Sequence, residues 1–189
     1  SDLADAFEQL GNTPEQNSPK VEVIESAIQV MDAFENLSEQ IQHMRGDIDK
    51  NISDEVDRAN TLLNEIAELN TDVVRQKNLG QPTTELEDQR DLKINQLSKI
   101  MNVTTYNRGD GSMVLFTANG NRTLLDRTPA TISFSPTAGF EPGTGGSGIM
   151  LNGEDVTDVI QNGTIKGLLE MRDTELPRLN GQINELAGE

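Results

Sequence analysis

A glycine-rich segment is the strongest candidate for a cofactor site in the sequence. Gly143-Thr144-Gly145-Gly146-Ser147-Gly148 matches the fingerprint of dinucleotide-binding folds. That chemistry requires a strand before the glycines and a helix after them, because the helix N-terminus holds the pyrophosphate. The next residues, Ile149 to Gly153, do not have the pattern of a first helical turn. We therefore interpret the segment as part of a flexible loop and expect no cofactor.

A second group of residues resembles part of a calcium-binding loop. Asp47, Asp49 and Asn51 have the spacing of the first three ligands of such a loop. Its sixth position requires glycine and its twelfth a bidentate glutamate, whereas this chain has Ile52 and Arg58 there. The sequence therefore predicts that these aspartates lie on the solvated face of a helix, and we expect no metal ion.

Residue types that could perform acid–base catalysis are present, but nothing in the sequence builds a site around them. The chain has one histidine, His43, and no cysteine. Carboxylate pairs such as Glu85/Glu87 and Glu154/Asp155 would need a cleft that desolvates one carboxyl group. Aromatic side chains, which could wall such a cleft, make up only 3% of the chain. We expect His43 at the surface or boundary of a helix, no catalytic residue, and a protein that is not an enzyme.

The charge and composition of the chain exclude further classes of function. With 15 basic and 32 acidic side chains among 189 residues, the net charge is −17. This charge opposes binding to nucleic acid or to an anionic membrane, because clustered lysine and arginine bind both. Apolar runs are only a few residues long, too short to span a membrane. With 34% hydrophobic residues and no tryptophan, burial depends on aliphatic side chains, which suits helices packed in thin layers.

A long stripe of apolar residues predicts the main structural element of the chain. This element carries several of the candidate residues named above, among them His43, Asp47 and Asp49. Between residues 19 and 79, apolar side chains recur almost always three or four positions apart, which is the helical period. The stripe consists of Ile24, Ala27/Ile28, Met31, Phe34, Leu37, Ile41, Met44, Ile48, Ile52, Val56, Ala59, Leu63, Ile66, Leu69 and Val73. We expect one helix of about 90 Å, at 1.5 Å per residue, or two helices that meet end to end near Gly46–Asn51.

Shorter helical patterns flank this element. Residues 1–10 predict a short amphipathic helix, followed by a polar loop through Thr13-Pro14 to a helix start at Ser18-Pro19. Thr84 and Glu87 form a capping box that opens a helix over residues 84–101. A last helix, capped by Thr164 and kinked at Pro177, returns to the bundle.

Between these helices the sequence changes to short β-prone segments. Four candidate strands, at 103–106, 113–117, 122–125 and 130–134, predict a small antiparallel meander at one end of the helices. A flexible Gly/Pro-rich loop over 135–148 follows. The fold class we expect is mainly α with a small β part: an elongated antiparallel helical bundle plus a β-meander. The expected domains are a bundle formed by residues 1–102 and 163–189, and a β part at 103–162.

Two sequence motifs are specific enough as a pair to suggest a family. The first is Leu63-Asn64-Glu65-Ile66-Ala67-Glu68-Leu69-Asn70, followed by Leu86-Glu87-Asp88-Gln89-Arg90-Asp91. The second is Gly167-Leu168-Leu169-Glu170-Met171-Arg172-Asp173, with Leu176-Pro177 after it. Together they resemble the bacterial flagellar hook-associated protein 1 family, the hook–filament junction proteins. The resemblance covers most of the chain and thins between about 135 and 162.

The resemblance implies an exported structural protein, assembled into the axial structure of the flagellum outside the cell. Its partners would be hook and hook-associated subunits, further copies of itself in the full assembly, and an export chaperone. Terminal segments that form the inner tube in this family are missing here, so we expect a central fragment that is monomeric alone. Six residues are candidates for structural register or subunit contact, with ion pairs that fix the register of the bundle as the favoured role: Asp88, Gln89, Arg90, Asp91, Arg172 and Asp173.

Three functions remain open from the sequence. The first is a structural subunit of the hook–filament junction that acts by subunit packing. The second is a flagellin-like filament subunit. The third is an acidic helical adaptor that binds a basic or amphipathic partner.

Overall fold

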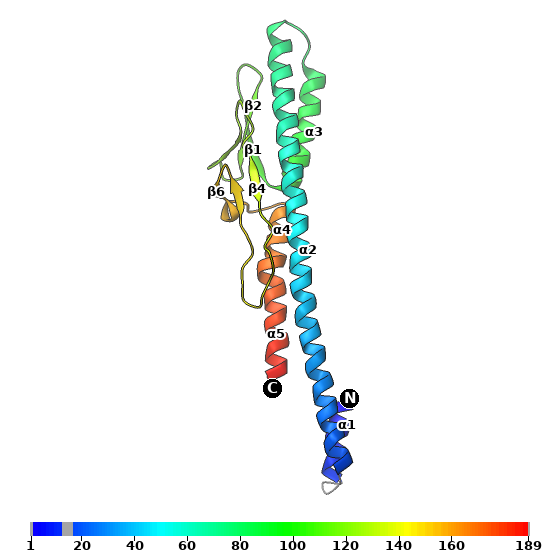
Figure 1. The fold of residues 1–189 in the computed structure, drawn as a ribbon. Helices are drawn as coiled ribbons and strands as arrows, with labels where there is room; N and C mark the ends of the chain where they lie inside the picture. The colour runs from blue at the N-terminus through cyan, green and yellow to red at the C-terminus, as the bar shows by residue number, and fades with distance from the viewer. Residues whose placement is uncertain (1, 13–16, 189) are drawn as a thin grey trace.

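The molecule is an elongated helical bundle with two small sheets along one side. The computed structural model describes residues 2–12 and 17–188. Figure 1 shows one helix, α2, running almost the full length of the structure, with the other helices packed along it. The elements are α1 (Asp2–Asn12), α2 (Asn17–Asn78), α3 (Thr84–Ile100), α4 (Thr164–Glu170), the π-helical stretch η2 (Met171–Glu175) and α5 (Leu176–Gly188). The predicted mainly helical fold class is confirmed.

The long stripe forms a single helix, so the alternative of two helices meeting near Gly46–Asn51 is wrong. The α2 helix ends where the sequence predicted, through a Schellman motif. Gly80 has a φ of +70°, and its N–H donates to the Lys77 carbonyl at 3.0 Å. The N–H of Gln81 donates to the Gln76 carbonyl at 3.0 Å. Because two terminal carbonyls are satisfied, the chain can reverse into α3, which packs antiparallel to α2 (Figure 1).

Helix starts differ slightly from the expectations. The α2 helix begins at Asn17, one residue before Ser18, and the predicted turn at Thr13-Pro14 lies outside the described residues. At α3 the cap is Thr83, not Thr84, and the Thr83 hydroxyl donates to the Glu87 carboxylate at 2.9 Å. Thr164 is the first residue of α4, and its hydroxyl donates to the Lys99 carbonyl at 3.1 Å instead of capping its own helix.

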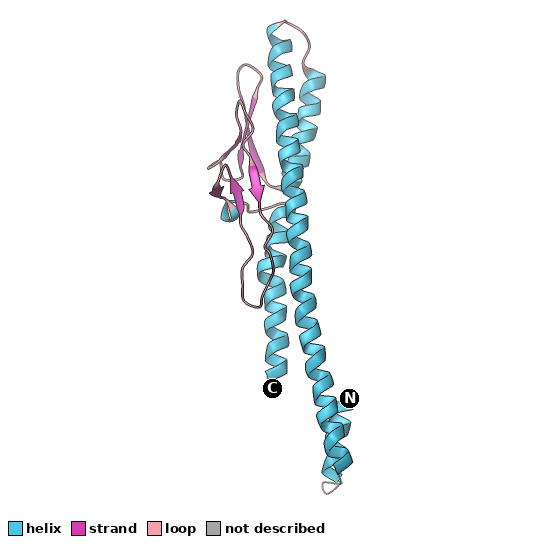
Figure 2. Cartoon of the chain, in the orientation of Figure 1, coloured by secondary structure: helices cyan, strands magenta, loops and turns pink. Residues whose placement is uncertain are grey.

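The β part consists of two three-stranded antiparallel sheets, not one meander (Figure 2). The first sheet contains β1 (Val103–Asn107), β2 (Met113–Thr117) and β3 (Thr123–Leu125). The second contains β4 (Ile132–Phe134), β5 (Ile149–Leu151) and β6 (Glu154–Asp155), followed by a 3₁₀ turn at Thr157–Val159. After β3 a bridge between Leu125 and Pro129 turns the chain, so β4 pairs with β5 and not with β3.

Both sheets lie beside the C-terminal half and the middle of α2, not at the end of the helices (Figure 1). They share one hydrophobic core with the helices, because side chains such as Ile52, Leu63, Leu115 and Ile149 are fully buried in the same cluster. The β part therefore packs on the helical bundle instead of forming a separate core.

Two asparagines on α2 form hydrogen bonds that join the two sheets to this helix. The Asn60 side-chain amide donates to the Ile132 carbonyl at 2.7 Å, and its oxygen accepts from the Ile132 N–H at 2.9 Å. Asn70 makes the same pair of bonds with Met113, at 2.8 and 3.0 Å. Each carboxamide therefore replaces a neighbouring strand for one residue of a sheet.

The apolar stripe of α2 is covered along only part of its length. From Ile41 toward its C-terminus, α3, α4, α5 and the sheets bury most of the stripe. Toward the N-terminus α1 and α5 pack on it over part of its length (Figure 1), and large apolar side chains remain exposed there. They are Val21, Ile24, Ile28, Val30, Met31, Leu37 and, near the border, Met44.

Candidate functional site

A cluster of charged residues, all buried except one aspartate, joins α2 to η2 near the middle of the molecule. The side chains of Arg172 and Asp49 are both about 1% exposed, and Nη1 of Arg172 lies 2.6 Å from Oδ1 of Asp49. Arg172 also donates through Nε and Nη2 to the two carboxylate oxygens of Asp173, at 2.9 and 2.6 Å. Arg45, also 1% exposed, donates through Nε to the Arg172 carbonyl at 3.0 Å. We call Arg45, Asp49, Arg172 and Asp173 the arginine cluster.

Helical spacing and one proline explain why these residues meet. Arg45 and Asp49 are four positions apart on α2, so they share a face. Arg172 and Asp173 lie in η2, which precedes Pro177. The sequence predicted a kink at Pro177, and the structure has a five-residue π-helical stretch between α4 and α5 just before this proline. Its backbone presents the Arg172 carbonyl to Arg45.

The loop over residues 135–148, here called the strap, closes the cluster from outside. The Thr137 N–H donates to Oδ2 of Asp49 at 2.6 Å, and the Gly146 N–H donates to Oδ1 of Asp173 at 3.2 Å. In return the strap carbonyls of Thr144 and Ser147 accept from Arg45 and Arg172. The glycine-rich segment was expected to be flexible. These bonds instead tie it to the bundle, and strand β5 follows it.

Opposing effects act on the two guanidinium groups. Burial lowers the pKa of Arg45, the charge of Asp173 opposes this, and the positive charge of Arg172 adds to the lowering. For Arg172, burial again lowers the pKa, but the hydrogen bonds that it donates to Asp173 and Asp49, together with the charges of these carboxylates, raise it above its ordinary value. Arginine keeps its proton at physiological pH in either case, so the cluster contains two cations and two carboxylates.

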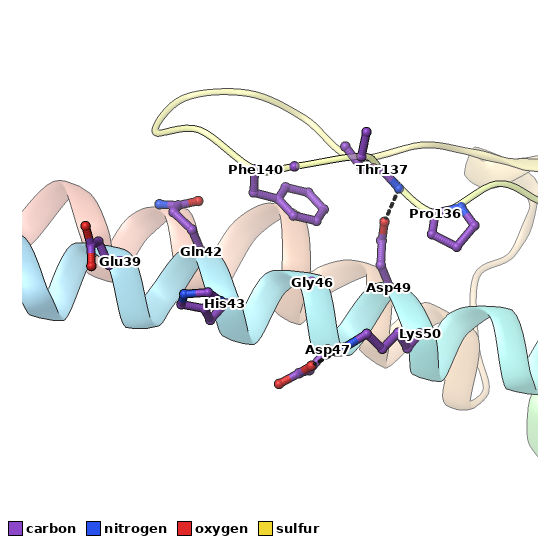
Figure 3. A pocket seen from close by; sticks show the side chains of 12 residues that line it. Glu39, Gln42, His43, Gly46, Asp47, Asp49, Lys50, Pro136, Thr137 and Phe140 are labelled. Carbon is purple, nitrogen blue, oxygen red and sulfur yellow. Dashed lines mark hydrogen bonds and ion pairs between the residues drawn. The ribbon is translucent and has the colours of Figure 1, made fainter.

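Next to the cluster lies a shallow open groove of about 680 Å³ between α2 and the strap. Figure 3 shows the Phe140 ring projecting from the strap toward α2, and the backbone N–H of Thr137 facing Asp49. The Phe140 ring also contacts Arg45, whose Cζ lies 4.3 Å from the ring centroid. Part of the groove wall is the solvated face of α2, where His43 is exposed and Asp47 pairs with Lys50 at 2.9 Å. The groove is open to solvent and has both polar and apolar lining residues.

The six predicted contact residues fall into two separate places. Asp88, Gln89 and Asp91 are exposed on α3, whereas Arg90 is 2% exposed. Arg90 donates to the Asn70 side-chain oxygen at 2.9 Å and to the Gly111 carbonyl at 2.8 Å. Arg90 therefore joins α3 to α2 and to the β1–β2 turn through neutral acceptors, not through the expected ion pairs with its neighbours.

Arg172 and Asp173, the other two predicted residues, pair with each other in the arginine cluster. The role of Arg45, which donates several of the bonds in the cluster, was not predicted from the sequence. The prediction that Asp49 lies on the solvated face is wrong, because Asp49 is buried. The four-residue spacing of Arg45 and Asp49 along the inward side of α2 was the available signal. Asp49 lies between Ile48 and Ile52, both of which pack into or against the core.

Metal-ligand clusters and membrane-spanning helices are both absent from the described part of the chain. Among residues 2–12 and 17–188, no three histidine, cysteine or acidic side chains are placed to hold a metal ion. None of the helices described is both long enough and apolar enough to cross a membrane.

Comparison with known proteins connects this fold to flagellar structure. A family model described as the flagellar hook-associated protein FlgK helical domain matches residues 1–189. Among solved structures, the chain is similar to the flagellar hook junction protein FlgK from Burkholderia pseudomallei, with a TM-score of 0.73 and 20% sequence identity. The match covers 91% of this chain and 33% of that protein, so the chain spans one third of the length of this relative. A comparison with curated proteins finds no match.

The structural likeness, at that identity, supports the fold, and the family model supports the membership. Because that model spans the whole sequence, the chain belongs to the family of flagellar hook-associated protein FlgK helical domains.

Proposed function

We propose that this chain is the helical part of a structural subunit at the hook–filament junction of a bacterial flagellum. It acts by packing against neighbouring subunits and performs no catalysis. Its place of action is outside the cell, after export by the flagellar secretion apparatus. Its partners are hook and hook-associated subunits and other copies of the same protein, with a chaperone before export. Membership of the FlgK helical-domain family supports this proposal.

The observation that carries the proposal is the uncovered apolar face on the N-terminal half of α2. Ile24, Ile28 and Met31 are 59%, 51% and 61% exposed, although they continue the stripe that is buried farther along the same helix. On α5, Leu186 is 63% exposed. Contiguous exposed apolar side chains on a water-exposed protein indicate a surface that another protein covers. In a rod-shaped subunit, side-by-side packing in a tubular assembly would cover such a surface.

A test uses the complete parent protein in the motile source bacterium. Ile28→Glu and Met31→Glu each place a charge on the apolar face. Gln29→Glu places the same charge at a neighbouring exposed position outside the stripe. We expect the first two variants to be exported and folded but to leave hooks without filaments, and the Gln29 variant to swim normally. Normal motility of all three variants would contradict a packing role for this face.

The location within the axial structure separates the two flagellar functions. If the protein belongs to the junction, a strain lacking it has complete hooks, and labelled protein in a restored strain occurs in a short zone at the hook tip. A flagellin-like filament subunit would instead label the whole filament.

The acidic adaptor remains the alternative from another class, supported by the net charge of −17. If the chain were an adaptor, the isolated 189 residues would be sufficient to bind a basic or amphipathic helix. Titration of the chain with a basic amphipathic peptide should give no saturable binding at physiological salt if the junction proposal is correct. Saturable binding that Ile28→Glu abolishes would favour the adaptor.

A further inference from the structure

The backbone of η2 has an unusual hydrogen-bonding problem. The Leu176 N–H donates to the Met171 carbonyl five residues back, as in a π-helix. One residue later, Pro177 has no N–H to donate. Neither Leu176 nor Pro177 therefore supplies a hydrogen to the Arg172 carbonyl. An ordinary α-helix would give the Arg172 carbonyl the Leu176 N–H as its donor. The ring of Pro177 would then clash with the Asp173 carbonyl four residues back, which would have no backbone donor.

Arg45 supplies the missing donor from another helix. Its Nε donates to the Arg172 carbonyl at 3.0 Å, across 127 residues of sequence. Both side chains are only about 1% exposed, so water cannot readily replace this bond, and a buried carbonyl without a partner is costly. Arg172 is itself held by Asp49 on α2 at 2.6 Å. The π-helical form of η2 therefore depends on two side chains of α2.

The strap controls access to this arrangement. Backbone carbonyls of Thr144 and Ser147 accept from the guanidinium groups of Arg45 and Arg172. Gly146 packs so tightly against Arg172 that a Cβ at this position would overlap the guanidinium carbon. The strap and the guanidinium groups therefore occupy their positions together, and moving the strap removes acceptors from both arginines.

We propose that the arginine cluster and the strap form a two-state conformational device at the Pro177 interruption. In the closed state Arg45 completes η2, and α5 packs on α2 with Leu176 and Asn180 buried. When the strap moves away, η2 returns to α-helical hydrogen bonding, and the proline then bends the helix as prolines in α-helices do. The α5 helix consequently leaves the surface of α2. This inference concerns the chain alone and goes beyond the proposed function.

A double-mutant cycle tests the central step. The variants are Arg45→Met, Pro177→Ala and the combination, and the measurement is amide hydrogen exchange of α5 in the 189-residue chain. We expect Arg45→Met to speed exchange of residues 178–184 about tenfold or more, as expected for local opening. Pro177→Ala restores a backbone N–H at that position, so in its background Arg45→Met should have a several-fold smaller effect. Equal effects in both backgrounds would overturn the proposal.

A matched glycine pair tests the strap and also decides the question if Arg45→Met fails to fold. Gly146→Ala should displace the Arg172 guanidinium and speed exchange in α5. Gly145→Ala is the control, because a Cβ there meets nothing within 4 Å. Exchange in α3 should be the same in both variants. If Gly146→Ala leaves α5 as protected as Gly145→Ala does, the strap does not control the helix and the device does not exist.

Discussion

Asn60 on α2 pairs with the backbone of Ile132 on β4 as a neighbouring strand would. Its amide nitrogen donates to the Ile132 carbonyl and its oxygen accepts from the Ile132 N–H. β4 is an edge strand of its sheet, so this one side chain satisfies edge groups that a strand would otherwise leave unpaired. Asn70 makes the same pair of bonds with Met113 on β2, the central strand of the other sheet. The contact between helix and sheet is therefore specific as well as hydrophobic.

The first prediction concerns this pairing. Asn60→Ala should lower the free energy of unfolding by about 1–3 kcal/mol, because the N–H and carbonyl of Ile132 lose their partners. Asn60→Asp should cost more, since a carboxylate cannot donate to the Ile132 carbonyl and would repel it. Urea unfolding followed by circular dichroism measures both changes.

Asn64 provides the control for these variants. It lies one turn farther along α2, is exposed, and bonds only locally to the Asn60 carbonyl at 2.9 Å. Asn64→Ala should change stability by less than about 0.5 kcal/mol, as surface substitutions usually do. If Asn60→Ala and Asn64→Ala had the same effect, the pairing with β4 would not contribute to stability.

The second prediction concerns Arg90. Replacing it with methionine keeps most of the apolar volume but removes two bonds from a charged donor, to Asn70 and to Gly111. Burying a charge has its own cost, so the methionine recovers part of the loss. We expect the cost of leaving the Gly111 carbonyl without a donor to exceed the gain from removing the buried charge. The net destabilisation should be about 1.5–3 kcal/mol.

The neighbouring α3 positions separate this structural role from a role in subunit contact. Gln89→Met and Asp91→Asn alter exposed side chains, so they should leave thermal unfolding of the chain almost unchanged. If Arg90→Met unfolds at the same temperature as wild type, Arg90 does not fix the register of the bundle. An assembly defect from Asp91→Asn with unchanged stability would assign that residue to a subunit contact.

The helical parts were predictable because their signals are local. The apolar residues from Ile24 to Val73 recur at the helical period, which predicts a helix directly. Gly80 ends α2 because it adopts a positive φ. The stripe also predicted which face is apolar. It could not predict how much of that face would be covered, because burial depends on where α1 and α5 begin and end.

The arginine cluster was not predictable in the same way because its partners are distant in sequence. Asp49 was assigned to the solvated face of a helix together with Asp47, but its partner Arg172 is 123 residues away. The division into two sheets depends similarly on a bridge between Leu125 and Pro129. An asparagine such as Asn60, beside the buried Ala59, gives no sign in the sequence that it will pair with a strand.

The third prediction concerns Gly163, which precedes α4. Its φ is +95°, and a Cβ there would lie 2.5 Å from the Ile100 carbonyl oxygen and 2.9 Å from Cα of Met101. Both contacts are with backbone, which cannot move aside as a side chain can. Gly163→Ala should therefore destabilise the chain by more than about 2 kcal/mol, through strain and steric overlap.

Gly167, one turn into α4, is the matched control. It is exposed and a Cβ there meets nothing within 4 Å. Gly167→Ala should stabilise the chain by about 0.5–1 kcal/mol, because alanine loses less backbone entropy in a helix. Opposite signs for the two glycines, measured by thermal unfolding, are the expected result. A loss of stability in both would show that α4 tolerates no added methyl group and that the contact with Ile100 is not the cause.

The last prediction concerns the shape of the isolated chain in solution. The 62 residues of α2 extend about 93 Å at 1.5 Å per residue. A thin rod of that length has a radius of gyration of roughly 27 Å, whereas a compact domain of this size would have about 16 Å. Small-angle scattering should therefore give a value well above that of a compact domain. Light scattering should give the mass of a monomer, 20.7 kDa.

Ile28→Glu serves as the control for association through the apolar face, and should scatter like wild type. A compact profile would mean that α2 is not one continuous helix in solution, and a larger mass abolished by Ile28→Glu would mean that two copies cover the face for each other.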